Sequence, residues 1–252
     1  CSSDLRTHFT ARVVERLTWD GQPAVILDRT AFYPESGGQP ADRGTLGNAA
    51  VLDVIEREAD GDGETVIVHV LSDEVPTDVV EGEIAWPRRF DHMQQHTGQH
   101  ILSAAFAQGL DADTIGFHLG ADSSTIDVDV ADLEMEAVLP VESRANVVIW
   151  DDRPVSIRLV EGDAVASLPT ESLPDVAGPI RLIEITGPAG AAEALFDANP
   201  CGGTHVARTG EIGMIKVVGL EHRGEETRVE FLCGRRALRD YEAMRRITAD
   251  LG

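Results

Sequence analysis

The chain has 252 residues, of which 42% are hydrophobic, enough for a buried core and for one or two domains. It contains no run of about 18 apolar residues and no charged-then-apolar leader, so neither a membrane span nor a secretory signal is predicted. Its three cysteines are too few for a disulfide scaffold. These features together predict a cytoplasmic protein.

The charge balance is strongly acidic, with 44 acidic residues against 21 basic ones and a formal net charge of −23. All basic residues except Lys216 are arginine. Taken alone, this charge argues against nucleic-acid binding, because phosphate contacts come from basic surfaces. Halophilic adaptation to a very salty cytoplasm explains it as well, since molar salt reduces the screening length to about 3 Å. The charge therefore weakens the case for an RNA substrate without excluding it.

The same charge predicts a dependence on salt. At low ionic strength, repulsion between acidic side chains opposes compaction, and added salt screens it. We expect the melting temperature to rise from low salt to molar KCl. A melting temperature that stays flat or falls over this range would contradict the halophilic interpretation.

The N-terminal third is predicted to consist of strands and turns. A turn at Asp20-Gly21 joins the first two strands, and Pro87 is predicted to end the last one. The predicted strands are residues 8–18, 24–27, 50–55, 65–71 and 79–86, with a turn-rich segment at 59–64. Many short strands without a convincing helix favour a small β-barrel domain at residues 1–87.

The pattern then changes to mixed α+β. Apolar residues recur at helical spacing over residues 88–110, which predicts a helix with Asp91 as its N-terminal cap. Further helices are predicted at 133–139, at 140–150 with Pro140 in the first turn, at 161–168 and at 235–251. Further strands are predicted at 114–119, 124–130, 154–160, 180–185, 212–220 and 227–233. We assign residues 88–235 to an α+β domain and 236–252 to the start of a C-terminal helix, for which truncation is one interpretation.

Three histidines, His92, His96 and His100, are spaced four apart on the first predicted helix. Side chains at i and i+4 lie on one helical face and can share a metal, whereas i and i+8 lie about 12 Å apart along the axis. One adjacent pair can therefore bind a metal that the third histidine cannot reach. On its own this spacing is a weak signal, because solvated or core histidines produce it too.

A second ligand pair strengthens the signal. Cys201 and His205 lie four residues apart in the glycine-rich segment N-P-C-G-G-T-H. A thiolate combined with imidazoles suits zinc. The alternative is a buried cysteine beside a plain turn. Two such pairs in a chain with only eight histidines and three cysteines favour a bound Zn²⁺.

The two pairs lie in motifs that resemble a known family. H-T-G-Q-H at residues 96–100 and C-G-G-T-H-V at 201–206 resemble the editing domain of alanyl-tRNA synthetases and the freestanding AlaX trans-editing proteins. The segment F-Y-P-E-S-G-G-Q-P-A-D-R-G at 32–44 is similar to the glycine-rich segment of the synthetase and of the longer AlaX proteins. G-F-H-L-G at 116–120 and G-E-I-G at 210–213 also fit. The resemblance covers most of residues 8–236.

This resemblance implies a ligand set and a reaction. The zinc ligands would be His96, His100, Cys201 and His205, with His92 outside the set. The reaction would be hydrolysis of the aminoacyl ester on tRNA(Ala) mischarged mainly with serine and secondly with glycine. The threonyl-tRNA synthetase editing domain shares the two zinc pairs, but the Gly-Gly-Gln triplet at 37–39 favours the alanyl branch.

The substrate-binding residues implied are Gly37, Gly38, Gln39 and Thr204. On three residues alone, Gly-Gly-Gln is more simply a β-turn between strands. The resemblance favours a segment that reaches the editing pocket, where the Gln39 amide can bond the substrate. No catalytic residue is identified. The polar candidates near the pocket are Thr97, Gln99, His118 and Thr125.

Four protein ligands describe a closed structural zinc site, whereas a catalytic zinc keeps one position open. The metal therefore either gains a fifth ligand, has one loose protein ligand, or organises the pocket while a water held by polar groups attacks. Two alternatives to a trans-editing hydrolase stay open: a non-catalytic zinc module that binds tRNA, and the editing fragment of a full alanyl-tRNA synthetase. The metalloprotease motif H-E-x-x-H and the nucleophile elbow G-x-S-x-G are absent. The P-loop motif is absent too, so no nucleotide cofactor is predicted.

Overall fold

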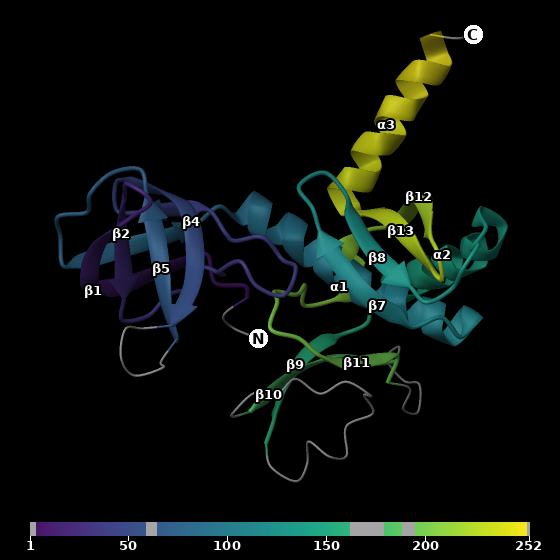
Figure 1. Ribbon diagram of the computed structural model, residues 1–252, viewed down its shortest axis with the longest axis horizontal. Helices are drawn as coiled ribbons and strands as arrows, with labels where there is room; N and C mark the ends of the chain where they lie inside the picture. The colour runs from purple at the N-terminus through teal and green to yellow at the C-terminus, as the bar shows by residue number, and fades with distance from the viewer. Residues whose placement is uncertain (1–3, 59–64, 162–178, 188–194, 251–252) are drawn as a thin grey trace. The chain divides into compact units, whose positions relative to one another are not determined.

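The computed structural model describes residues 4–58, 65–161, 179–187 and 195–250. The chain divides into two compact units, residues 1–92 and 93–252 (Figure 1). Within the described residues, no helix combines the length and the apolar character that crossing a bilayer requires. The predicted turn segment at 59–64 and most of the predicted helix at 161–168 lie outside the described residues.

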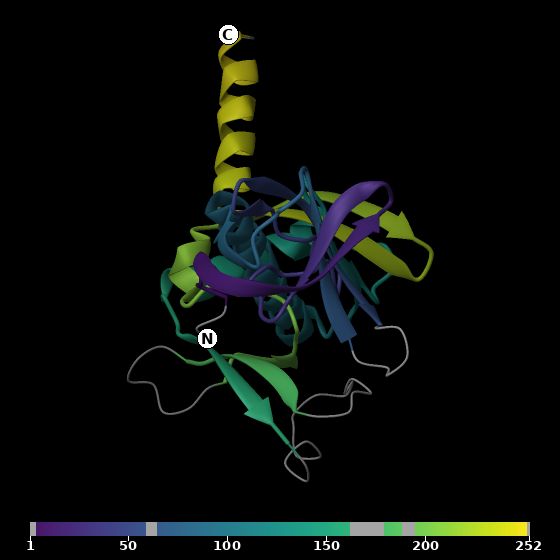
Figure 2. The ribbon, with the colours of Figure 1, turned by 90° about the vertical axis from the view of Figure 1, so that its left-hand side faces the viewer.

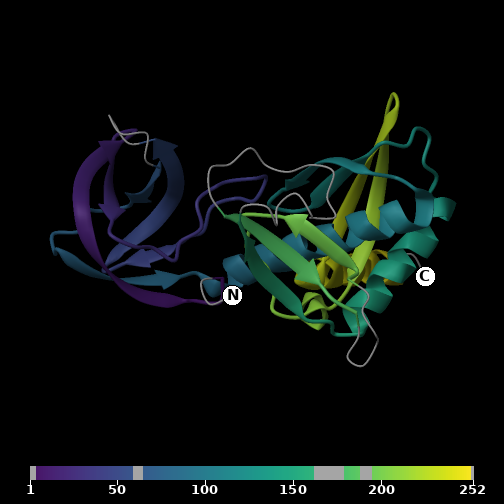
Figure 3. The same ribbon diagram turned by 90° about the horizontal axis from the view of Figure 1, so that it is seen from below.

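The first unit is built on a closed antiparallel barrel, which confirms the predicted N-terminal barrel (Figure 3). The strands follow the order β1-β2-β5-β4-β3-β6, and pairing of β6 with β1 closes the barrel. Their bounds are β1 His8–Trp19, β2 Gln22–Leu27, β3 Gly44–Leu46, β4 Ala49–Glu58, β5 Thr65–Leu71 and β6 Val79–Ile84. The predicted turn between β1 and β2 is present, with positive φ at both Asp20 and Gly21.

Strand β3 was not predicted, because three residues are too few to show an alternating pattern. Its position depends on Gly44, where an added Cβ would lie 2.0 Å from the carbonyl oxygen of Glu83 on β6. Inside the barrel, inward-facing apolar side chains pack together, and the rings of Phe9 and Phe32 meet edge to face at 5.7 Å.

His69 on β5 is a fully buried histidine of this unit. Its Nε2 lies 2.8 Å from the Thr30 hydroxyl, which accepts the N–H of Phe32 and can donate its own proton to the ring. Its Nδ1 faces the carbonyl oxygen of Val25 at 3.3 Å, which fits a neutral ring protonated at Nδ1. Burial lowers the pKa of His69 to about 4, with the Val25 bond opposing it.

The lowered pKa predicts acid destabilisation. The unfolded chain takes up a proton at His69 near pH 6.5, whereas the folded protein resists this down to about pH 4. Stability from the neutral ring is therefore complete above pH 6.5 and falls by about 3 kcal/mol as the pH drops to 4. Between pH 7 and pH 4, the free energy of unfolding should therefore fall by about 3 kcal/mol less in His69→Gln than in the wild type. Equal losses in the two proteins would contradict the assignment.

The second unit contains two antiparallel sheets and most of the helical structure, which confirms the α+β class. One sheet has the order β12-β13-β8-β7 and the other β11-β10-β9. The strand bounds are β7 Thr114–Leu119, β8 Ser124–Val128, β9 Val155–Val160, β10 Ile180–Ile185, β11 Asp197–Pro200, β12 Ile215–Arg223 and β13 Glu226–Cys233. The helices are α1 Trp86–Leu110, α2 Met135–Trp150, the 3-10 helix η2 Thr209–Ile212, and α3 Gly234–Asp250, which extends away from β13 (Figure 2).

Helix α2 packs along the edge strand β12. The Asn146 side chain accepts the N–H of Ile215 at 3.0 Å and donates to its carbonyl at 2.9 Å. The carboxylate of Glu142 accepts the N–H of Val217 at 2.7 Å. These side chains satisfy backbone groups that an edge strand otherwise leaves open. Helix α1 buries the apolar face that the sequence predicts, with Met93, Ile101 and Phe106 fully buried.

Two predicted helix starts are wrong. Helix α1 begins at Trp86, so Asp91 lies inside it and is not its N-terminal cap, and Pro87 occupies the first turn instead of ending a strand. Proline is tolerated there because a first-turn N–H has no partner within the helix. Pro140 lies inside the single helix α2 instead of starting a second helix. Proline has no N–H, so Pro140 cannot donate to the carbonyl of Glu136 one turn earlier. Glu136 is an exposed residue near the start of α2.

Candidate metal centre

Helix α1 supplies the first ligand pair. His96 and His100 lie one turn apart with ring centroids 5.5 Å from each other, and both are buried. Gly98 between them lets the helix approach β13 closely, because an added Cβ would lie 2.3 Å from the Sγ of Cys233. The Gln95 amide donates to the Cys233 carbonyl at 3.1 Å and accepts its N–H at 2.9 Å. The glycine of H-T-G-Q-H thus serves packing of the helix against the sheet.

The loop after β11 supplies the second pair, Cys201 and His205. Strand β10 holds this loop, since the Cys201 N–H donates to the Arg181 carbonyl at 3.0 Å. The Arg181 guanidinium in turn donates to the carbonyls of Cys201 at 2.8 Å and Gly203 at 2.7 Å. The Gly203 N–H points at the Cys201 sulfur at 3.4 Å. One arginine therefore fixes both sides of the turn that presents the thiol.

The two pairs converge. Ligand atoms of His96, His100, Cys201 and His205 all lie within 4.8 Å of one another, so this group can hold a metal ion. The Cys201 Sγ lies 3.3 Å from the Nε2 of His96 and 3.3 Å from the Nε2 of His205. Tetrahedral zinc with bonds of about 2.0 Å to nitrogen and 2.3 Å to sulfur separates its ligands by roughly 3.5 Å. The donor types and their spacing both fit zinc. His92 is buried but lies outside this set.

The second nitrogen of two ligand rings is held by a neighbouring side chain. The Nδ1 of His100 lies 3.1 Å from Oδ2 of the buried Asp197. The Nδ1 of His205 lies 3.2 Å from the hydroxyl of Thr97, which also accepts the N–H of Val206 at 3.2 Å. Such partners fix the orientation of ligating histidines and leave Nε2 for the metal.

The charges of the cluster favour a cation. Burial alone would raise the pKa of the Cys201 thiol, but the facing His96 and His205 rings hold it well below its usual range. Burial lowers the pKa of His205 to about 3. Burial also opposes protonation of His100, yet Asp197 and Cys201 together raise its pKa to about 10. A metal cation would replace the proton on His100 and meet a thiolate.

The polar candidates differ in where the structure places them. Thr97 is fully buried and contacts His205, so its position is that of a ligand-orienting residue. Gln99 donates to the hydroxyl of Ser103 on its own helix at 3.0 Å. Thr204 is buried within the loop that carries Cys201 and His205.

His118 and Thr125 are not brought to the cluster. Phe117 lies next to His96, with ring centroids 5.6 Å apart, and is 36% exposed. Successive side chains of a strand point to opposite faces, so His118 points away from the face that Phe117 occupies. Thr125 pairs with His118 across β7 and β8 and shares its face. Sequence spacing alone cannot distinguish these two faces.

The Gly-Gly-Gln segment forms a tight turn in the first unit. Ser36 and Gln39 exchange backbone hydrogen bonds of 2.9 and 3.2 Å across Gly37 and Gly38. The φ angles of the two glycines are 53° and 77°, as in a type I′ turn. The simpler interpretation from the sequence, a β-turn, is therefore present. Gln39 is fully buried, so in this structure its amide is not presented at the surface.

Several residues that shape the cluster were not predicted. Asp197, Arg181 and Phe117 belong to this group. A carboxylate four residues before Cys201 was a usable signal for Asp197, because metal-bound histidines commonly bond a carboxylate. Nothing in the sequence distinguishes Arg181 from the other arginines.

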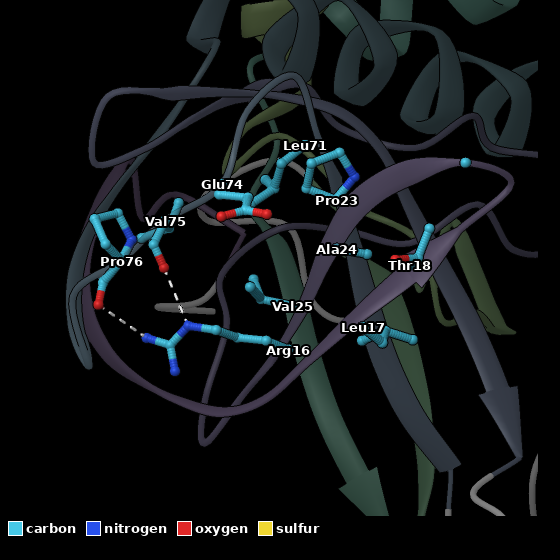
Figure 4. Close-up of a pocket in the computed structure, with 11 residues that line it drawn as sticks. Arg16, Leu17, Thr18, Pro23, Ala24, Val25, Leu71, Glu74, Val75 and Pro76 are labelled. Carbon is cyan, nitrogen blue, oxygen red and sulfur yellow. Dashed lines mark hydrogen bonds between the residues drawn. The ribbon is translucent and has the colours of Figure 1, made fainter.

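A separate pocket of about 470 Å³ lies on the barrel unit (Figure 4). The Arg16 side chain reaches across it and donates to the carbonyls of Val75 at 3.1 Å and Pro76 at 3.5 Å. The residues that line it include none of the metal or substrate-binding candidates. The chemistry predicted from the sequence is therefore not located in this pocket.

The barrel and the buried Cys/His cluster define a two-unit protein with a candidate metal centre, and the sequence comparisons give the family. A family model described as "Threonyl and Alanyl tRNA synthetase second additional domain" matches residues 180–247. Another, described as "tRNA synthetases class II (A)", matches residues 7–87. The first match contains Cys201 and His205, and the second contains the Gly-Gly-Gln turn.

Three curated relatives are alanyl-tRNA editing proteins. AlaX-M of Methanosarcina acetivorans is 33% identical over 86% of this chain and 90% of its own length. AlaX-L of Pyrococcus horikoshii is 35% identical over 92% of this chain and 58% of its own length. Aarsd1-B of Xenopus laevis is 39% identical over 85% of this chain and 50% of its own length. The chain therefore belongs to the alanyl-tRNA editing protein family. It spans 50% of the length of Aarsd1-B and 58% of the length of AlaX-L.

Proposed function

We propose that this protein hydrolyses the aminoacyl ester of tRNA(Ala) mischarged with serine, and secondly with glycine, as a zinc-dependent trans-editing factor in the cytoplasm. The observation that carries the proposal is the convergence of four ligand atoms from His96, His100, Cys201 and His205 within 4.8 Å. The names of the relatives, which are alanyl-tRNA editing proteins, support the tRNA substrate.

Zinc, when bound, supplies a positive charge that can polarise an ester carbonyl or a water molecule. Three histidines and a cysteine would give a bound metal four protein ligands, and this donor count favours a metal that organises the pocket. Asp197 and Thr97 hold the ligand rings in place. Cys201 is only partly buried, whereas the three histidines are buried, so the thiol is the accessible part of the cluster. An aminoacyl ester can approach there.

For substrate binding we propose Thr204 and the Gly37-Gly38-Gln39 turn. Thr204 lies between two metal ligands in the sequence, and its hydroxyl suits the hydroxyl of a seryl group. The positive φ angles of the turn give it a backbone shape that other residues adopt only with strain. Gln39 belongs to this set through the backbone of the turn, since its side chain is buried.

The test is deacylation of purified tRNA(Ala) charged with serine, measured against spontaneous hydrolysis, together with tRNA binding by the same protein. The proposal expects release of serine well above the spontaneous rate. The four-ligand shell also favours a second candidate, a non-catalytic tRNA-binding module. Binding of tRNA without release of serine would establish that candidate and refute the hydrolase.

A further inference from the structure

The Gly-Gly-Gln turn lies in a long connection between β2 and β3, residues 28–43. Its only ladder feature is the bridge between Ser36 and Gln39. Connections of this length without secondary structure are uncommon in compact domains and usually serve function or are disordered. This connection is ordered by contacts at its neck, which we define as residues 31–33 and 41–42 near its two ends. Two of the residues responsible, Asp42 and Arg89, are 0% and 1% exposed.

Asp42 ties the two sides of the neck together. Its carboxylate accepts the N–H of Tyr33 at 2.7 Å, and its own N–H donates to the Tyr33 carbonyl at 3.0 Å. Further out, the Tyr33 hydroxyl donates to the carbonyl of Ser36, which begins the turn, at 3.1 Å. The Glu35 N–H donates to the carbonyl of Val54 on β4 at 3.1 Å. Hydrogen bonds thus continue from Asp42 to the turn.

Arg89 fixes this neck to the first turns of α1. Its Nε donates to both carboxylate oxygens of Asp42 at 3.0 Å, and its Nη2 makes a further close contact with Asp42. The same guanidinium donates to the carbonyls of Ala31 at 2.7 Å and Asp4 at 2.8 Å. The neighbouring Arg88 donates to the Ala41 carbonyl at 3.0 Å. Two adjacent arginines therefore hold both sides of the connection.

We propose that Asp42 and Arg89 are positioning residues that hold the Gly-Gly-Gln turn and thereby set the preference for seryl over alanyl esters. This inference rests on the proposed function. A buried ion pair is weak evidence for stability, because the loss of hydration offsets its attraction. Its planar, forked geometry gives orientation instead, and a lysine cannot reproduce it. A loop that must meet a substrate within a fraction of an ångström needs such fixed support.

The test compares Arg89→Lys with the wild type and with Arg228→Lys. The control changes a second forked arginine–aspartate pair, Arg228 with Asp127 in the second unit, whose bonds are 2.6 and 2.7 Å. We measure kcat and KM on seryl- and alanyl-tRNA(Ala), zinc content and melting temperature. Arg89→Lys should lower the seryl-to-alanyl preference at least about tenfold, mainly through KM for the seryl substrate, with zinc content unchanged. Arg228→Lys should leave the preference as in the wild type.

A lower melting temperature for Arg89→Lys with an unchanged preference would show a purely structural pair and overturn the proposal. If this variant does not fold, Arg88→Gln, which removes the bond to Ala41, should still lower the preference, and an unchanged preference there overturns the proposal equally. Hydrolysis by the wild type distinguishes failure of the proposed function from failure of this inference. A wild-type protein that hydrolyses neither ester refutes the proposed function, and this inference with it.

Discussion

Seryl-tRNA(Ala) should be deacylated roughly 10⁴-fold faster than correctly charged alanyl-tRNA(Ala), measured as kcat/KM under the same conditions. A pocket sized for alanine discriminates only about a hundredfold against an added hydroxyl, which is why a synthetase makes this error. A site built to hydrogen-bond the hydroxyl leaves its own polar groups unpaired when alanine enters. Thr204, a buried residue of the loop that carries Cys201 and His205, is our candidate for the partner of the seryl hydroxyl. Equal rates on the two esters would contradict editing and favour a general esterase.

The glycine turn provides a matched test of the same preference. Gly37 has φ of 53° and open space around its missing Cβ, and Gly47 in the β3–β4 turn has φ of 56° and equally open space. Alanine at either position costs about 1–2 kcal/mol through its left-handed backbone. We expect both variants to lose similar stability, but only Gly37→Ala to reduce the seryl preference. A reduced preference in both variants would show an effect of stability alone.

The metal should be lost when its ligands or their supports are changed. Zinc is expected at about one per chain in the wild type, because one Cys/His group of four is present in the described residues. Cys201→Ala and His100→Ala should leave little zinc after dialysis and lower hydrolysis to the rate of the metal-free protein. Asp197→Asn keeps all four ligands but weakens the bond to the His100 ring, so zinc affinity should fall about 10- to 100-fold.

Cys233→Ala is the control for these variants. Cys233 is a buried free cysteine on β13, and its backbone, not its sulfur, pairs with Gln95. We expect this variant to keep its zinc and its activity. Zinc loss in Cys233→Ala as large as in Cys201→Ala would show that the metal reports on folding in general. Full zinc affinity in Asp197→Asn would show that the carboxylate does not support His100.

Local periodicity explains what the sequence could predict. The prediction that His96 and His100 lie on one helical face does not depend on where α1 begins, since both lie well inside the helix. The glycine-rich N-P-C-G-G-T-H segment identifies the second pair without knowledge of its strands. The barrel follows from alternating strands, although β3 and β11 are too short to show a pattern.

What the sequence could not predict depends on tertiary contacts. Asp197 lies on the unpredicted strand β11, so its proximity to Cys201 in the sequence does not show which histidine it contacts. The sequence offers His118 and Thr125 as polar candidates near the pocket, but the register of β7 and β8 puts them on the face opposite Phe117. The prediction that Pro140 starts a helix is wrong, because the preference of proline for the first turn is statistical and α2 runs through it from Met135 to Trp150.

The most direct test of the account is deacylation of seryl-tRNA(Ala) by the protein stripped of metal and then given one equivalent of zinc. The cluster of His96, His100, Cys201 and His205 predicts that activity is lost with the metal and returns with about one zinc per chain. Wild-type protein without added chelator gives the reference rate, and melting curves of the stripped protein report whether it stays folded. Folded, metal-free protein that hydrolyses seryl-tRNA(Ala) at the reference rate would contradict the zinc-dependent mechanism.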